Sequence, residues 1–199
     1  MPKRGREQEA YTLTLGDRAE NHAGMQTIGD AAESGLSAET LRDISAMPAI
    51  VYDLKDDLPL AKRAKAAEAV VLVFKKGVDR LAQLTGKTLS ADGILKELKA
   101  CQYDKKALMG RGAGRKVKNK RARWNNCFGD EPQQPDYEAG KGTIVAFRDV
   151  PQISGLRTAL PQLLGEKVEN LVAETNYYYE AGSTYIGWCV CPCHSLSMP

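Results

Sequence analysis

The sequence predicts a mixed α+β protein, and three stretches in its second half carry that prediction. Residues 143–147 are an apolar run, residues 152–163 place leucine and isoleucine at spacings of three and four, and residues 171–179 are dense in β-branched and aromatic side chains. These patterns are typical of a strand, an amphipathic helix and a second strand. After a turn at residues 180–183 a β-prone run resumes at residues 184–188. Strand, helix and hairpin in this order give an α+β domain that forms half of a sandwich.

The first fifty residues predict one strand and two helices. Residues 1–10 are charged and lack an apolar run, so we expect a disordered basic lead. Residues 11–15 alternate as a short strand with its apolar side chains toward the core. Residues 25–33 and 37–47 predict two helices, the second beginning at Ser37 and ending before a proline.

Residues 60–84 predict the strongest helix of the chain, with Gly77 as a possible break. Within them, the apolar run at residues 69–74 is equally compatible with a buried strand, and periodicity alone does not decide between the two. Ser90 then begins a further helix over residues 94–101.

Residues 105–123 form a basic loop, the main charge anomaly of the chain. They hold nine basic residues, three glycines and no acid. A run of this kind in contact with phosphates gains affinity through counterion release, whereas the alternative interpretation is a solvated loop without a ligand. Trp124 follows as a possible surface for base stacking. The candidate nucleic-acid-binding residues are Arg115, Lys116, Lys118, Lys120, Arg121, Arg123 and Trp124.

Composition sets broad limits on the class of protein. The 199 residues are 43% hydrophobic, enough for a core, and carry a formal net charge of +3. No secretory signal and no apolar run of membrane-spanning length is visible, so we expect an intracellular protein, cytoplasmic or nuclear, with no membrane partner. The five cysteines are then expected to be free thiols.

A short motif near the end of the chain resembles a known enzyme family. Asn176 and Tyr178, a polar turn, and then Ile186 and Gly187 resemble the N-x-Y…I-G-x-H-x-D segment of AlkB-type dioxygenases, which depend on 2-oxoglutarate and Fe(II). The similarity is closer to the AlkB-like proteins of giant viruses and protists, and covers most of the chain up to Trp188. Further stretches that carry it are GDRAENHAGMQ at residues 16–26, RARWNNCFGDEPQQPDYEAGKGTIVAFRDVP at residues 121–151 and LVAETNYYY at residues 171–179.

The resemblance implies a fold, two cofactors and two binding residues. The fold is N-terminal helices followed by an incomplete double-stranded β-helix, which is jelly-roll-like. The cofactors are 2-oxoglutarate and Fe(II), and Asn176 and Tyr178 inherit the role of binding the 2-oxoglutarate carboxylates. AlkB relatives act on alkylated nucleic acid, so the resemblance also favours a nucleic-acid-binding role for the basic segment.

The chain departs from the family where the iron ligands belong. In place of the first His and the Asp it has Cys189 and Cys191, and only residues 192–199 follow. A facial triad needs two imidazoles and a carboxylate around one metal. We therefore assign no catalytic and no metal-binding residue, and we expect this truncated form to bind no iron and to have little or no dioxygenase activity.

The last eleven residues admit three interpretations. Cys189, Cys191, Cys193 and His194 are donors that zinc accepts, but their spacing is too tight for the usual paired ligands of a structural site. The second interpretation is a tail of free thiols. The third, which we favour, is a Cys-rich tail read out of register with its gene, because the composition changes abruptly at Cys189.

Other residues predict structure rather than chemistry. His22 is isolated in the sequence and is interpreted as a surface or hydrogen-bonded structural histidine. The glycines at residues 110–114 lack the ending of a phosphate-binding P-loop. Two histidines are too few for a nucleophile, base and acid arrangement.

The predicted organisation has five parts. They are the basic lead at 1–10, a mainly helical region at 11–104, the basic loop at 105–123, a partial dioxygenase β-domain at 124–188 and the Cys-rich tail at 189–199. Two hypotheses of function follow. One is a 2-oxoglutarate and Fe(II) oxygenase for dealkylation or hydroxylation, inactive in this form, and the other is a non-enzymatic nucleic-acid-binding module that uses residues 105–124.

Overall fold

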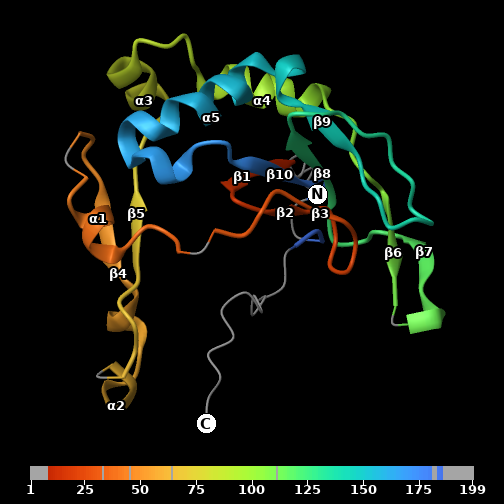
Figure 1. Ribbon diagram of the computed structural model, residues 1–199, viewed down its shortest axis with the longest axis horizontal. Helices are drawn as coiled ribbons and strands as arrows, with labels where there is room; N and C mark the ends of the chain where they lie inside the picture. The colour runs from red at the N-terminus through yellow and green to blue at the C-terminus, as the bar shows by residue number, and fades with distance from the viewer. Residues whose placement is uncertain are drawn as a thin grey trace, which may run out of the picture.

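The computed structural model describes residues 9–32, 34–44, 46–63, 65–110, 112–180 and 183–185. Within these ranges the chain is mixed α+β, with five α-helices and ten strands, which confirms the predicted class (Figure 1). None of the helices in the described ranges is both long and apolar enough to cross a membrane. The predicted disordered lead, up to residue 8, and the Cys-rich tail lie outside the described residues.

A four-stranded sheet joins the two ends of the described chain. Its order is β1 (Ala10–Gly16), β10 (Val172–Tyr178), β8 (Trp124–Gly129) and β9 (Ile144–Ala146). The first three strands are antiparallel, and β9 runs parallel to β8. The strands predicted at residues 11–15 and 171–179 are therefore confirmed, and they are direct neighbours although about 160 residues separate them.

The sheet has one apolar face and one polar face, because neighbouring residues of a strand point to opposite sides. Ala173 of β10 lies opposite Phe128 of β8, and both belong to the main core cluster. That face is covered by α4 (Ala91–Ala100) and α5 (Pro151–Leu164), as Figure 1 shows. Asn176 of β10, on the opposite face, is the register partner of Asn125 of β8. This polar face is the one on which the candidate site is built.

Helices α4 and α5 begin and end where the sequence predicts. The Ser90 hydroxyl caps α4 by accepting a hydrogen bond from the Gly93 N–H at 3.0 Å. Helix α5 has Pro151 in its first turn and ends at Gly165, whose φ is +84°. Ile153 and Ala159 are fully buried on its inner face. Both helices are therefore confirmed, with bounds that differ from the prediction by one to three residues.

The predicted helix at residues 25–33 is wrong. The segment holds β3 (Thr27–Ile28), which pairs with β2 (Ala19–Glu20). Gly29 follows with a φ of +74°, and a Cβ there would lie 2.1 Å from the Asp17 carbonyl oxygen. The chain therefore turns tightly against its own backbone at this point. The next helix, α1 (Ala38–Arg42), begins after Ser37 as predicted but is shorter than residues 37–47.

The long helix predicted at residues 60–84 is also wrong over its middle. It is divided into α2 (Leu60–Arg63), β5 (Val70–Val73) and α3 (Gly77–Thr85). Strand β5 pairs with β4 (Ile50–Asp53) in a two-stranded ribbon (Figure 1). Three valines in four positions favour extended backbone over helix, so the alternative of a strand is the correct one, although it is half exposed rather than buried.

Candidate functional site

The basic segment is a β-hairpin, not the loop that its composition predicts. Strand β6 (Lys106–Met109) pairs with β7 (Lys116–Asn119), with Leu108 opposite Val117. Leu108 is buried and Val117 half buried, so an apolar cross-strand pair anchors the ribbon. Gly110 begins the turn with a φ of +118°, which favours glycine. The hairpin thus holds its charged side chains outward in a fixed arrangement.

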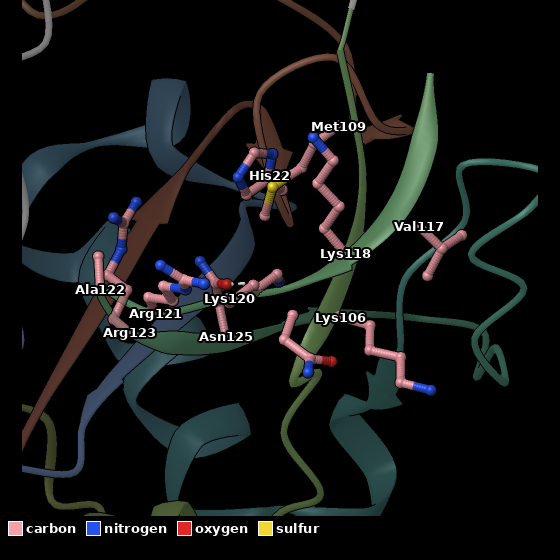
Figure 2. A pocket seen from close by; sticks show the side chains of 11 residues that line it. His22, Lys106, Met109, Val117, Lys118, Lys120, Arg121, Ala122, Arg123 and Asn125 are labelled. Carbon is pink, nitrogen blue, oxygen red and sulfur yellow. Dashed lines mark hydrogen bonds between the residues drawn. The ribbon is translucent and has the colours of Figure 1, made fainter. Parts of the chain in front are cut away.

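A cavity of about 830 Å³ lies between this hairpin, residues 120–123 and the loop that follows β2. Figure 2 shows the side chains that line it, drawn from these separate segments. Of the described residues that line it, none is acidic. The titratable ones are His22, Lys106, Lys118, Lys120, Arg121 and Arg123. A concave surface with five cations and no acid focuses a positive potential, which attracts anions.

Lys120 lies in the wall of this cavity and is only 6% exposed. Its ammonium group donates to Asn21 Oδ1 at 2.5 Å and to Asn125 Oδ1 at 2.6 Å, with the Asn21 carbonyl oxygen at 3.4 Å. Burial lowers the pKa of Lys120 to about 8, against the opposing attraction of Asp104. The sequence predicts Lys120 as one of several equivalent surface cations, whereas the structure places it in a cage of amide oxygens.

Asp104 fixes that cage from behind. It is fully buried and accepts hydrogen bonds from Asn21 Nδ2 at 2.6 Å, from Thr143 N and Oγ1 at 2.7 Å each, and from Tyr137 at 2.8 Å. The three residues that it joins come from two separate parts of the chain, the loop of Asn21 and the segment 137–143. A buried carboxylate with this many donors is well satisfied, so it holds the loop of Asn21 against the sheet.

Asn176, the residue that the resemblance assigns to 2-oxoglutarate, lies beside the cavity on the polar face of the sheet. It is 3% exposed, and its Oδ1 accepts hydrogen bonds from Arg123 Nε at 2.5 Å and Asn125 Nδ2 at 3.0 Å. Tyr178 follows two positions later on the same strand, so it shares this face. Asn176 and the cavity cation Arg123 are therefore in direct contact.

Trp124 lies on the other face of the sheet and is not among the described residues that line the cavity. Its ring stacks on Tyr179 with centroids 4.4 Å apart, and the Lys105 ammonium lies 4.2 Å from its centroid. Tyr177 approaches its edge, with centroids 5.7 Å apart. The indole is thus packed within an aromatic cluster, on the face of the sheet opposite Asn125.

The remaining predicted contacts lie on the rim or outside the cavity. Lys118 and Arg121 are exposed and line it. Lys116 is exposed on β7, and Arg115 is tied by its guanidinium to the Gly24 carbonyl oxygen. The structure therefore brings together Lys118, Lys120, Arg121 and Arg123, and adds Lys106.

Sequence reasoning missed His22 and Asn125 as cavity residues. His22 was interpreted as a structural residue, but it lies in the loop that forms one wall. Burial lowers its pKa, and the charges of Lys120 and Arg123 add to that effect. Asn125 carried little local signal, because the next residue is also an asparagine and lies on the opposite face of β8.

Among the described residues, no group of three His, Cys, Asp or Glu side chains is arranged to hold a metal ion. Cys189, Cys191, Cys193 and His194, the donors considered for zinc, lie outside the described residues. Cys101 and Cys127, which are described, are both free thiols as predicted.

One comparison with known proteins identifies a relative. The chain is 33% identical over 186 residues to an uncharacterized protein of Acanthamoeba polyphaga mimivirus, and the match covers 90% of this chain and 68% of the relative. No model of a protein family matches the sequence. No solved structure matches either.

Proposed function

This chain belongs to the same family as the uncharacterized mimivirus protein, and we propose that it binds nucleic acid through the phosphate groups. The observation that carries the proposal is the cavity with five cations and no acid among its described lining residues. Three of the five, Lys106, Lys118 and Arg121, are exposed at the cavity and free to meet a ligand.

Phosphate is the anion that best explains this arrangement. The cations come from two strands of a hairpin and the segment after it, so a ligand with several phosphates can meet more than one of them around the cavity. Each contact with a backbone phosphate releases condensed counterions, which gives affinity with little dependence on base sequence.

The test is the salt dependence of binding to a labelled single-stranded oligonucleotide, measured by fluorescence anisotropy. The triple variant Lys106→Gln, Lys118→Gln and Arg121→Gln removes three cavity cations. We expect it to bind more weakly, and the slope of log affinity against log salt to fall by about 2, since each lost phosphate contact contributes about 0.7 for single strands.

A matched control distinguishes the loss of cavity cations from the loss of net positive charge. The variant Lys62→Gln, Lys65→Gln and Lys75→Gln also removes three positive charges, all from exposed positions outside the cavity. It should keep the affinity of the wild type. Equal losses in the two triple variants, or none in the cavity variant, would overturn the proposal.

A second candidate function is binding of 2-oxoglutarate, and the position of Asn176 favours it. An amide and a guanidinium in contact, on the polar face of a sheet and next to a basic cavity, suit a carboxylate. Tyr178 shares that face. In this proposal the four-stranded sheet is one wall of a double-stranded β-helix, as the resemblance to AlkB-type oxygenases implies.

The fit to the two implied cofactors differs. The described residues offer donors for the carboxylates of 2-oxoglutarate but no ligand set for Fe(II). At the positions where the resemblance places the first iron ligands the chain has Cys189 and Cys191. We therefore derive no chemical step through iron, and we expect little conversion of 2-oxoglutarate to succinate when iron is added.

Calorimetric titration with 2-oxoglutarate tests this candidate. Replacing Asn176 by Ala should weaken binding about tenfold, as expected for the loss of one charge-assisted contact of about 1.4 kcal/mol. The exposed Gln134→Ala variant is the control and should bind as the wild type does. Absence of binding to the wild type would exclude this candidate and leave the nucleic-acid proposal intact.

A further inference from the structure

Lys120 differs from every other cation of the cavity in what surrounds its nitrogen. The other four lysines and arginines of the lining are exposed or half buried, whereas Lys120 is 6% exposed. Its closest partners are the side-chain oxygens of Asn21 and Asn125, both neutral amides. A lysine that serves only as a fixed charge is normally paired with a carboxylate when it is buried. Here the carboxylate of Asp104, whose charge acts on Lys120, accepts its hydrogen bond from the Asn21 amide instead.

The cage suits a neutral amine as well as an ammonium ion. A neutral amine has two N–H donors, which match the two acceptors at 2.5 and 2.6 Å. The third acceptor, the Asn21 carbonyl oxygen at 3.4 Å, is a weak partner. Burial lowers the pKa of Lys120 to about 8. At pH 7 about a tenth of the molecules would then carry the neutral amine, far more than for a free lysine with a pKa of about 10.4.

The cavity residues around Lys120 also determine which kind of substrate its amine would contact. Lys106, Lys118 and Arg121 attract a phosphate to the cavity that Lys120 lines. His22 lines the same cavity, and burial lowers its pKa, which favours the neutral imidazole that can accept a proton. A lysine amine that is activated by burial forms Schiff bases with carbonyl groups.

We propose that Lys120 forms an imine with an aldehyde that carries a phosphate bound by the cavity cations. This inference rests on the proposed phosphate binding and names a reactive substrate for the same site. The neutral Nζ attacks the carbonyl carbon and forms a C–N bond, and a proton moves from nitrogen to oxygen to give a carbinolamine. Loss of the hydroxyl group with a proton, as water, then gives the imine. No oxidant or reductant is consumed.

The experiment uses two phosphate-bearing aldehydes and traps the imine by reduction with borohydride. Pyridoxal 5′-phosphate represents a small phosphorylated aldehyde, and an oligonucleotide with one abasic site represents an aldehyde within a nucleic acid. Peptide mapping by mass spectrometry then identifies the modified lysine. We expect the adduct on Lys120 of the wild-type chain, with at least about tenfold less at the more exposed Lys106 and Lys118, because burial activates the Lys120 amine as a nucleophile.

The variant Lys120→Arg keeps a positive charge but cannot form the imine, and Lys75→Arg, at an exposed position that does not line the cavity, is its matched control. Trapping should be lost in the first and kept in the second. The wild-type peptide map decides the question even where the Lys120 variant folds poorly. Adducts spread over exposed lysines, or no adduct with either aldehyde, would overturn the inference.

Anisotropy with an intact oligonucleotide in the same samples separates the two proposals. Salt-dependent binding without trapping refutes the imine and leaves nucleic-acid binding standing. Trapping of pyridoxal 5′-phosphate at Lys120 without binding of nucleic acid supports the imine and identifies a small metabolite as the source of the aldehyde. Trapping of both aldehydes identifies nucleic acid as a source.

Discussion

A single carboxylate, Asp104, orders the residues around the cavity. Its two oxygens accept four hydrogen bonds, from Asn21, Tyr137 and both donors of Thr143, at 2.6 to 2.8 Å. We expect Asp104→Ala to lower the free energy of unfolding by about 3 kcal/mol, because it leaves several buried donors without a partner. Urea denaturation followed by circular dichroism measures this change.

The control for Asp104 is Asp56, whose side chain is 77% exposed beside Arg63. Asp56→Ala should change the free energy of unfolding by less than about 0.5 kcal/mol, as surface ion pairs usually do. If the two variants were equally stable, the polar network around Asp104 would contribute nothing to the fold.

These residue-scale contacts could not be predicted from the sequence. Asn21 and Asp104 are 83 positions apart, and Asn21 and Lys120 are 99 apart, so no local pattern reports that they meet. Lys120 stands in a run of basic residues that all look alike by composition. Only the pairing of strands shows that one of them is turned inward while its neighbours remain exposed.

At the scale of elements, the hairpin of β6 and β7 depends on the conformation of one glycine. A Cβ at Gly110 would lie 2.9 Å from the Gly114 carbonyl oxygen, at a φ of +118° that other residues rarely adopt. We expect Gly110→Ala to cost about 1–2 kcal/mol of stability and to weaken oligonucleotide binding, because the lysines of the hairpin lose their fixed positions.

Gly114 is the matched control within the same turn. A Cβ there would meet nothing within 4 Å, so Gly114→Ala should leave both stability and anisotropy-derived affinity unchanged. Loss of binding in this variant as well would show that the turn tolerates no substitution and that binding does not depend on the conformation of Gly110 in particular.

Helix caps provide a second comparison between elements. Ser90 caps α4, which buries Ile94 and Leu98, whereas Ser37 caps α1, which buries no residue. Both hydroxyls accept a backbone N–H at 3.0 Å. Ser90→Ala should therefore cost about 1 kcal/mol in thermal or urea unfolding, and Ser37→Ala clearly less, because α1 contributes little to the core.

An equal cost for the two serine variants would mean that packing does not decide the value of a cap in this chain.

The comparison also explains which elements the sequence predicts well. Helices α4 and α5 combine a clear start with a buried apolar face, and both are confirmed. The helix predicted at 60–84 is wrong over its middle because the valine-rich run there is compatible with a helix and with a strand, and periodicity alone does not decide between them.

For the whole molecule, the pairing of β1 with β10 joins the first and last described strands of the chain. The sequence predicts both strands but not their pairing, which gives the central sheet its polar face. Lys120 is buried only because this face, the hairpin and the loop of Asn21 come together. The protonation state of Lys120 therefore depends on the complete fold, so the free energy of unfolding should change with it.

That dependence predicts how stability changes with pH. The pKa of Lys120 is about 8 in the folded chain and 10.5 as its ordinary value. Between these values the unfolded chain binds more protons than the folded one, so the contribution of Lys120 to stability grows as the pH rises. Relative to Lys120→Met, the wild type should gain about 1 kcal/mol per pH unit from pH 8 to 10.

The quantity to measure is the difference in free energy of unfolding between the wild type and Lys120→Met, because the titration of other groups changes stability in the opposite direction. Burial raises the pKa of Cys101 to about 11 and that of Cys127 to about 12. The contribution of both thiols to the stability of the fold therefore falls as the pH rises above their ordinary pKa of 9.0. The contribution of Cys101 is common to the wild type and the methionine variant and cancels in the comparison. The charge of Lys120 acts on the Cys127 thiol, so the contribution of Cys127 cancels only in part, and its remainder is smallest near pH 8. Urea unfolding at several pH values gives the difference directly. A constant difference from pH 8 to 10 would show that Lys120 keeps its proton in the folded chain, and the imine proposal would lose its supply of neutral amine.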